Sequence, residues 1–192
     1  KQFMQRHDIP TAKWMTYTRN PDGMNQCIFD LTNMRDYRPE DHYPVVIKED
    51  GLCGGKGVVV CKTKEDACSN LPHMFLNNIY KSPSNKILVE DFVEGDEASC
   101  FVVVDYNSYK ILPYCKDYKR AYDNNYGPNT GGMGAISPVP YITDKVKKLV
   151  EERIVKPTIH GMRRDGAIYR GVLYIGLMIK NGEPYVIEYN VR

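Results

Sequence analysis

Two lysines and a run of glycines form the first group of residues that could do chemistry. Lys48 ends the apolar segment 43–48, and it is followed by Gly51, Gly54, Gly55, Lys56 and Gly57. Glycines let backbone N–H groups approach an anion, and lysines add mobile positive charge, so the pattern predicts phosphate binding. It is not a Walker A loop, because Asp50 stands where that motif needs a glycine. A flexible hairpin tip with a solvated lysine is the alternative.

Acidic residues crowd the end of a second apolar segment. Five of the eight positions from 90 to 97 are acidic: Glu90, Asp91, Glu94, Asp96 and Glu97. Backbone groups at a strand end can hydrogen-bond a purine, and a carboxylate further along can accept both ribose hydroxyls. A solvated acidic turn is the alternative.

Near residue 190, polar residues alternate along an apolar segment. Glu188, Asn190 and Arg192 are two positions apart, so a strand would place them on one face. The two oxygen donors suit a hard divalent cation, and the guanidinium suits phosphate. Any half-exposed strand would also show this alternation.

The polar stretch 115–138 is a fourth candidate. A basic cluster opens it, and three glycines then fall in the four positions 131–134. Stretches this long without periodicity are uncommon and are usually functional or disordered. Backbone donors at the glycines could wrap an anionic substrate. A disordered linker is the alternative, although such linkers seldom carry so many aromatic and basic residues.

Strands and tight turns are predicted to hold these groups. Segments 43–48 and 58–61 predict a hairpin around the glycine-rich loop, and segments 87–92, 98–104 and 109–114 predict three further strands. Segments 171–179 and 184–191 flank Asn181-Gly182, which predicts a hairpin with a type I′ turn.

Three helices and one turn complete the predicted elements. A short amphipathic helix is expected over 1–9, ended by Pro10, and a second is expected over 64–75, capped by Thr63. Helical spacing from Thr143 predicts a third, which Pro157 should kink rather than end. Residues 20–23, Asn-Pro-Asp-Gly, predict a turn.

Composition excludes several classes of protein. The 192 residues carry 26 Lys and Arg against 24 Asp and Glu, and 42% are hydrophobic, which fits neither a disordered nor a fibrous chain. We expect no nucleic-acid partner, since no basic block appears, and no membrane span, since no apolar run approaches about 18 residues. The six cysteines are expected to be reduced thiols, and a cytoplasmic location is expected.

Taken together, the lysine hairpin, the acidic strand end and the Glu-x-Asn pair resemble the ATP-grasp superfamily. Within it, the chain is similar to the glycinamide ribonucleotide synthetase family, also called phosphoribosylamine–glycine ligases. The segments that carry this resemblance are 3–4, 9–12, 51–58, 117–120, 127–135 and 186–192. The most specific of them is 127–135, Gly-Pro-Asn-Thr-Gly-Gly-Met-Gly-Ala.

The resemblance implies an α+β, ATP-grasp fold in which two α+β lobes hold ATP between them. It implies a small nucleotide-lid lobe at about 43–93 and a larger lobe, with the metal site and substrate loop, at about 94–192. The first residue is Lys rather than Met, and we expect the family's N-terminal substrate lobe and C-terminal domain to lie outside this chain.

The resemblance also implies roles for individual residues. The ATP phosphates would be held by Lys48, Lys56 and the backbone of Gly54, Gly55 and Gly57. The adenine would meet Glu90, Asp91 and Val93, and the ribose would meet Glu97. Mg²⁺ or Mn²⁺ would bind Glu188 and Asn190. The second substrate or the acyl phosphate would face Asp117, Lys119, Arg120, Asn129, Thr130, Gly131, Gly132 and Arg192. Lys56 and Arg192 would be catalytic.

The implied activity is an ATP-dependent ligation in de novo purine synthesis. Glycine would be joined to 5-phosphoribosylamine through a glycyl phosphate, giving glycinamide ribonucleotide, ADP and phosphate. One alternative is another ATP-grasp ligase, such as a carboxylase of purine or biotin metabolism, although segment 127–135 argues against it. The other is a nucleotide-binding fragment without turnover. Fusion of the parent chain to other purine-pathway domains stays open.

Overall fold

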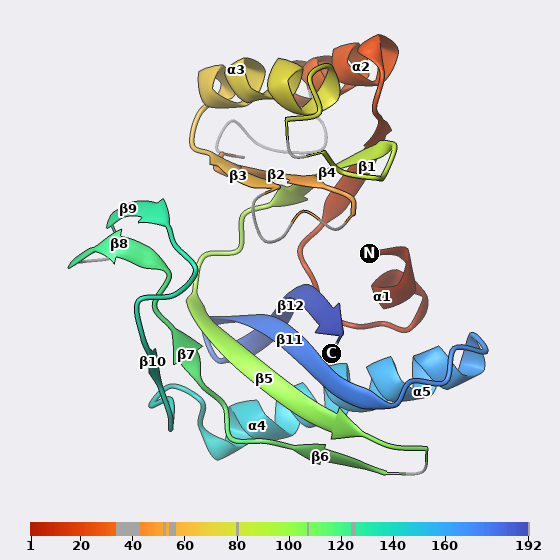
Figure 1. The fold of residues 1–192 in the computed structure, drawn as a ribbon, viewed down its shortest axis with the longest axis vertical. Coiled ribbons are helices and arrows are strands. Elements are labelled where there is room, and N and C mark those ends of the chain that lie inside the picture. Colours follow the sequence, from red (N-terminus) through yellow and green to blue (C-terminus); the bar gives the residue numbers. More distant parts are fainter. Residues whose placement is uncertain are drawn as a thin grey trace. The chain divides into compact units, whose positions relative to one another are not determined.

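The chain forms two compact units, each with its own four-stranded antiparallel sheet and its own apolar core (Figure 1). Unit 1 comprises Lys1–Thr11 and Val93–Arg192, and unit 2 comprises Ala12–Phe92. The computed structural model describes residues 1–33, 43–51, 53, 57–79, 81–106, 108–123 and 126–191, with the backbone alone at Pro128 and Asn129.

The sheet of unit 2 has the strand order β1-β4-β2-β3. Its strands are β1 (Trp14–Thr18), β2 (Val45–Glu49), β3 (Val58–Cys61) and β4 (Lys86–Asp91). The predicted hairpin is confirmed, because β2 and β3 pair in an antiparallel register with Lys48 opposite Val58. Helices α2 (Pro21–Asn33) and α3 (Lys64–Phe75) cover one face of the sheet (Figure 1).

Both helices of unit 2 begin at polar capping residues. Thr63 forms a capping box with Asp66, which confirms the helix predicted over 64–75. The turn predicted over 20–23 is wrong, because Pro21 begins α2 and Asn20 Oδ1 accepts the Gly23 N–H at 2.7 Å. Asn at the cap and Pro in the first helical turn favour a helix start as well as a turn, and the sequence alone did not separate the two.

The sheet of unit 1 has the strand order β12-β11-β5-β6. Its strands are β5 (Asp96–Val104), β6 (Tyr109–Ile111), β11 (Gly171–Lys180) and β12 (Glu183–Val191). The predicted type I′ hairpin fits the positive φ angles of Asn181 (53°) and Gly182 (80°) between β11 and β12. β6 ends three residues before the predicted boundary, ahead of Pro113, which cannot donate to a ladder.

Four α- or π-helical segments pack in the described part of unit 1. They are α1 (Gln2–Arg6), α4 (Asp144–Val150), the π-helical turn η2 (Glu151–Val155) and α5 (Lys156–Arg164). Thr143 caps α4 as predicted, accepting the Val146 N–H at 3.3 Å. The helix continues past Pro157, since the wider π-turn before it accommodates a residue that lacks an N–H.

The stretch 115–138 contains short strands, and the expectation of a loop without structure of its own is wrong. Its strands are β7 (Lys116–Asp117), β8 (Arg120–Tyr122), β9 (Tyr126–Asn129) and β10 (Ala135–Ile136). β7 pairs with β10 and β8 pairs with β9, both antiparallel. Strands of two to four residues are too short to show a period of two in the sequence.

All six cysteines lie in the described part of the chain and are free thiols, as predicted. None of the described helices combines the length and the apolar character that crossing a membrane requires.

Candidate functional site

Lys48 lies on the face of the unit 2 sheet opposite the helices, which we call the open face of unit 2. Along β2, Val45, Ile47 and Glu49 are buried on the helix side, whereas Val46 and Lys48 alternate with them. Val58 and Val60 of β3 pair with Lys48 and Val46 and are 46% and 41% exposed. This face therefore offers apolar surface beside a cation.

The predicted residues Lys48 and Glu90 form an ion pair on this face. Lys48 Nζ lies 3.1 Å from Glu90 Oε1, and the two side chains are 13% and 5% exposed. A pair this far removed from water is screened weakly by salt. Asp91 ends β4, and its N–H donates to the Lys13 carbonyl at 3.0 Å.

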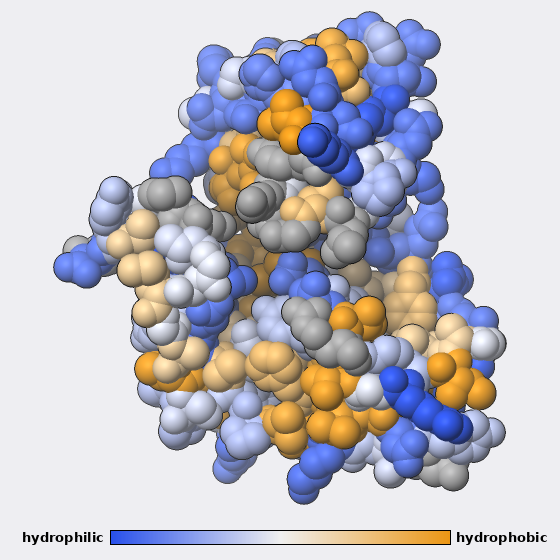
Figure 2. All heavy atoms as spheres, viewed as in Figure 1, coloured by the Kyte–Doolittle hydropathy of each residue, from blue (hydrophilic) through white to orange (hydrophobic). Residues whose placement is uncertain are grey.

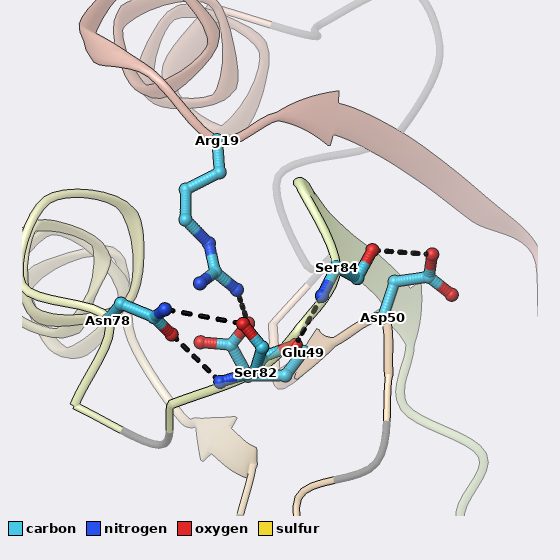
Figure 3. A network of polar contacts seen from close by, with 6 residues as sticks. All are labelled: Arg19, Glu49, Asp50, Asn78, Ser82 and Ser84. Atoms are coloured by element: carbon cyan, nitrogen blue, oxygen red, sulfur yellow. Dashed lines mark hydrogen bonds and ion pairs between the residues drawn. The ribbon is translucent and has the colours of Figure 1, made fainter.

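Glu49 fixes the end of the glycine-rich loop, at Gly57. The Glu49 N–H donates to the Gly57 carbonyl at 2.8 Å, which joins the two ends of the loop. Gly57 is buried, and a Cβ there would lie 2.9 Å from the Glu49 side chain. The Glu49 carboxylate is in turn bound by the guanidinium of Arg19, which follows β1 (Figure 3). Gly57 thus packs directly on a buried ion pair.

The start of the glycine-rich loop, at Asp50 and Gly51, is fixed by a series of polar contacts (Figure 3). Ser84 Oγ donates to Asp50 Oδ2 at 3.0 Å, and the Ser84 N–H donates to Ser82 Oγ at 3.3 Å. The Ser82 N–H donates to Asn78 Oδ1 at 3.0 Å. Gly51 has φ 152°, and a Cβ there would lie 2.9 Å from Ser82 Oγ. Both the start and the end of the glycine-rich loop are therefore held by polar or packing contacts.

Some predicted residues fall outside the described part of the chain. They are Gly54, Gly55, Lys56 and Arg192, together with the side chain of Asn129.

In unit 1, the predicted residues Glu97, Glu188 and Asn190 share the sheet face opposite the helices, which we call the open face of unit 1. Glu97 is opposite Met178 on β11, and Glu188 is opposite Gly176 two residues away. Leu173, Ile175, Leu177 and Ile179 of β11 are buried on the other face. Val93 begins the second segment of unit 1 and is half-buried.

The open face of unit 1 is polar at one end and apolar at the other. Phe101 and Val103 continue β5 beyond Glu97 and Ser99, and Val103 is 42% exposed. Figure 2 shows apolar side chains gathered over the β5 and β6 region. The candidate polar site is thus confined to the part of the face near the start of β5.

Lys119 lies in a cluster of acidic groups. Burial acts to lower the pKa of Lys119, but the acidic groups around it together raise that pKa above its ordinary value. These groups are Tyr174, Glu97, Glu188 and Asp117. The ammonium therefore stays protonated at neutral pH, and three carboxylates act on it electrostatically.

The two arms of the stretch 115–138 are joined around Lys119. The Thr130 N–H and Oγ1 both donate to the Lys119 carbonyl, at 2.6 and 2.9 Å. Arg120 Nη1 donates to the Gly127 carbonyl at 2.8 Å. Gly132 has φ 126°, and a Cβ there would lie 3.1 Å from Asp117 Oδ1. Gly131 has no atom near its Cβ position and is exposed.

Tyr174 and Ser99 belong to this site, and the sequence prediction missed them. Ser99 Oγ donates to Tyr174 Oη at 3.5 Å, and burial raises the pKa of the Tyr174 phenol, so it stays neutral. The available signal was the alternation of Tyr174 and Gly176 in an otherwise apolar strand, which gives two unusual positions on one face.

Comparison with known proteins decides the family. The family model described as phosphoribosylglycinamide synthetase, ATP-grasp (A) domain, matches residues 1–192. The chain belongs to this family. The phosphoribosylamine–glycine ligase of Leptospira interrogans serovar copenhageni is 42% identical over 193 residues, which cover 100% of this chain and 43% of that protein. The chain thus spans less than half the length of this relative.

Solved structures confirm the predicted ATP-grasp fold. The phosphoribosylamine–glycine ligase from Thermotoga maritima is 36% identical with a TM-score of 0.84, covering 100% of this chain and 46% of that chain. An N5-carboxyaminoimidazole ribonucleotide synthetase, solved as an ADP complex, is 19% identical with a TM-score of 0.69. This alignment covers 100% of this chain and 43% of that chain, and the similarity is one of fold alone.

The phosphoribosylglycinamide synthetase family has an ATP-grasp domain, and ATP-grasp ligases use ATP with a divalent cation. Glu188 and Asn190 offer two oxygen donors, and Asn190 Nδ2 donates to Glu188 Oε1 at 3.3 Å. Within the described ranges, no three His, Cys, Asp or Glu side chains gather as a metal site of their own. Mg²⁺ commonly takes one or two carboxylates and completes its shell with water and phosphate oxygens. The donor set fits such a phosphate-bound cation.

Proposed function

We propose that the protein containing this chain is a phosphoribosylamine–glycine ligase, which joins glycine to 5-phosphoribosylamine and converts ATP to ADP and phosphate. The observation that carries the proposal is the match of all 192 residues to the ATP-grasp domain of the family. The lysine on the open face of unit 2 and the carboxylates on the open face of unit 1 supply the charges that a metal–nucleotide complex needs.

For the nucleotide, we assign the phosphates to Lys48, Lys56 and the backbone of Gly54, Gly55 and Gly57. The supporting observations are the contacts that fix both ends of the glycine-rich loop, and the largely buried ammonium of Lys48 beside exposed Val58 and Val60. Glu90, Asp91 and Val93 would meet the adenine edge, and Glu97 would accept the ribose hydroxyls. Apolar surface for the base and cationic charge for the phosphates suit the two ends of ATP.

For the metal, Glu188 and Asn190 would hold Mg²⁺ or Mn²⁺. The cation neutralises phosphate charge when it is bound. The remaining charge would be met by Lys48, Lys56 and Arg192, with Lys56 and Arg192 nearest the transferred group. The substrate side comprises Asp117, Lys119, Arg120, Asn129, Thr130, Gly131 and Gly132.

The proposed chemistry has two steps and needs no covalent enzyme intermediate. A carboxylate oxygen of glycine attacks the γ-phosphorus of ATP, the bond to the β–γ bridging oxygen breaks, and ADP leaves. The amine of phosphoribosylamine then attacks the carbonyl carbon of glycyl phosphate, inorganic phosphate leaves, and the nitrogen loses a proton. Protein side chains act by positioning and by neutralising charge, which is usual for phosphoryl transfer.

We further propose a cytoplasmic location, because six free thiols suit a reducing compartment. The partners would be small molecules.

The experiment is a ligation assay on the full-length protein with ATP, Mg²⁺, glycine and phosphoribosylamine. Glu188→Ala should abolish product and remove the effect of Mg²⁺ on ATP binding. Glu183→Ala is the matched control, because this carboxylate lies on the same strand and pairs with exposed Arg153. Product formation with another carboxylate or amine, and none with this pair, would overturn the assignment.

A further inference from the structure

Two β11 residues lie beside the proposed metal ligands on the open face of unit 1. Tyr174 is opposite Asn190 in the register of β11 and β12, and Gly176 is opposite Glu188. Because alternate residues of a strand share a face, these four residues lie together on one surface. None of the contacts below was expected from the sequence.

Gly176 leaves the space that the Glu188 side chain occupies. A Cβ at this position would lie 3.0 Å from Glu188 Cγ and 3.4 Å from Tyr174 Oη. Contacts of 3.0 to 3.4 Å are tighter than most Cβ contacts, so a larger residue would displace its neighbour. The Glu188 side chain therefore crosses over Gly176, and the Tyr174 hydroxyl reaches the same spot.

The Tyr174 ring is itself fixed. It packs against Phe101 with a centroid distance of 5.3 Å and an interplanar angle of 58°. Its oxygen accepts the Ser99 hydroxyl proton at 3.5 Å. The phenol proton then remains available to an oxygen that comes within reach.

The charges around Tyr174 favour a divalent cation. Glu97, Glu188 and Asp117 all act electrostatically on the ammonium of Lys119, and three carboxylates against one ammonium leave an excess of negative charge. A free carboxylate in such a cluster can turn toward Lys119 instead of toward a metal. Mg²⁺ requires near-ideal geometry from its ligands, so the direction of Glu188 matters.

We propose that Tyr174 and Gly176 are positioning residues for the metal ligand Glu188, with the Tyr174 hydroxyl orienting the carboxylate and Gly176 providing the space over which it lies. The proposal rests on the proposed function, because it takes Glu188 as a ligand of the ATP-bound cation. Groups that orient a ligand without touching the metal typically change metal affinity by about 10- to 100-fold.

The test measures ATP binding by calorimetry on the full-length protein while the Mg²⁺ concentration is varied. Tyr174→Phe removes the hydroxyl and keeps the ring, and Gly176→Ala adds the Cβ. Both variants should need at least about tenfold more Mg²⁺ for half of its effect on ATP affinity. ATP affinity without metal should stay at the wild-type value, which a general loss of structure would not allow.

Tyr109→Phe is the matched control. It removes a phenol that hydrogen-bonds a glutamate, Glu151 at 2.7 Å, but this phenol faces the helices of unit 1. Its Mg²⁺ requirement should be unchanged. The proposal is overturned if Tyr174→Phe and Gly176→Ala keep the wild-type requirement, or if they weaken metal-free ATP binding equally.

The outcome for Glu188→Ala separates this inference from the proposed function. If Glu188→Ala loses the Mg²⁺ effect while Tyr174→Phe and Gly176→Ala retain it, the positioning role alone is wrong. If the wild-type protein shows no Mg²⁺-dependent ATP binding, the proposed function fails together with the inference.

Discussion

Lys48 is held by Glu90 in the structure and is proposed to bind phosphate in the ATP complex. The two roles are compatible, since a lysine ammonium has three donors and Glu90 Oε1 lies 3.1 Å from it. The ion pair also holds the ammonium of Lys48 in a defined position on the open face of unit 2. Glu90 would thereby prepare Lys48 for an anionic ligand.

Lys48→Met should therefore weaken ATP binding about tenfold or more, because a charge-assisted hydrogen bond contributes roughly 1.5–3 kcal/mol. Calorimetry measures the affinity. Since the change leaves Glu90 buried without its cation, the double variant Lys48→Met/Glu90→Gln is needed beside it. The double variant should bind ATP as weakly as the single one; recovery of affinity in it would mean that Lys48 does not contact the nucleotide.

Lys48, Glu90, Glu97, Glu188 and Asn190 could be proposed as candidates from the sequence, because their positions along single strands carry the signal. The contact between Tyr174 and Ser99 could not be predicted, since it joins two residues that are 75 positions apart on different strands. Nothing local to either residue indicates that β5 pairs with β11 in this register. A sequence pattern indicates which residues of one strand share a face, but strand pairing decides which residues of the neighbouring strand lie beside them.

At the scale of elements, the end of β2 is held by a buried ion pair with incomplete hydrogen bonding. The side chains of Arg19 and Glu49 are 9% and 0% exposed, and among described residues Arg19 Nε and Glu49 Oε1 lack hydrogen-bond partners. The desolvation of such a pair offsets much of its attraction, whereas removal of one partner leaves a buried charge.

Glu49→Leu should consequently lower the free energy of unfolding by about 3–5 kcal/mol, while Arg19→Met/Glu49→Leu should recover most of that loss. Urea unfolding followed by Trp14 fluorescence reports on the correct unit, because Trp14 is the single tryptophan and begins β1. A double variant no more stable than Glu49→Leu would show that the pair contributes a large net stabilisation.

Helix α1 is held to α5 by charges near Asp165. Arg6 Nη2 donates to Asp165 Oδ2 at 2.7 Å, and His7 Nε2 lies 3.1 Å from Asp165 Oδ1. A Cβ on Gly161 would lie 2.7 Å from the His7 ring, so the two helices approach closely. The hydrogen bond from Arg6 lowers the pKa of Asp165 below its ordinary value of 3.8.

This lowered pKa predicts how the contact depends on pH. A carboxyl group whose pKa falls on folding stabilises the folded state above its unfolded pKa, and the effect is lost as the pH falls through the folded value. Asp165→Asn should therefore speed hydrogen exchange in α1 at pH 7, after correction for intrinsic rates. The difference from wild type should shrink as the pH falls below 3.8 and disappear only below the folded pKa, which is lower still.

Asp144→Asn is the control for this measurement, because Asp144 also has a lowered pKa from its hydrogen bond with Lys147 but lies on α4. Exchange in α1 should not respond to it. A difference between Asp165→Asn and wild type that persists at the lowest pH would assign the effect to packing rather than to charge.

Element types followed from sequence where periodicity or caps were strong, as in α3 and the β11–β12 hairpin. They did not follow where the residues fit two structures. Met24, Cys27, Ile28 and Leu31 of α2 belong to or pack on the core at helical spacing, but the Asn-Pro-Asp-Gly segment at its start also fits a turn. The strands β7 to β10 are defined by pairing with each other rather than by composition.

At the scale of the whole molecule, the residues proposed to bind ATP all lie in this chain, whereas ligation is proposed to need residues outside it as well. The residues assigned to nucleotide and metal lie between Lys48 and Asn190, inside the stretch shared with the relatives. That stretch is 43% of the length of the Leptospira relative. We expect some of the residues that hold phosphoribosylamine to belong to the remaining length.

The 192-residue chain alone should therefore bind Mg²⁺–ATP but make little glycinamide ribonucleotide. Ligation requires the amine to meet glycyl phosphate in a near-attack geometry, and a misplacement of about 1 Å can reduce the rate roughly a hundredfold. ADP should still form slowly, with water consuming the acyl phosphate in place of the amine. A coupled assay that measures ADP and product separately, on this chain and on the full-length protein, tests the expectation. Equal ligation rates would mean that the amine is positioned entirely by residues within this chain, and the search for its site would then return to Asp117, Lys119 and Arg120.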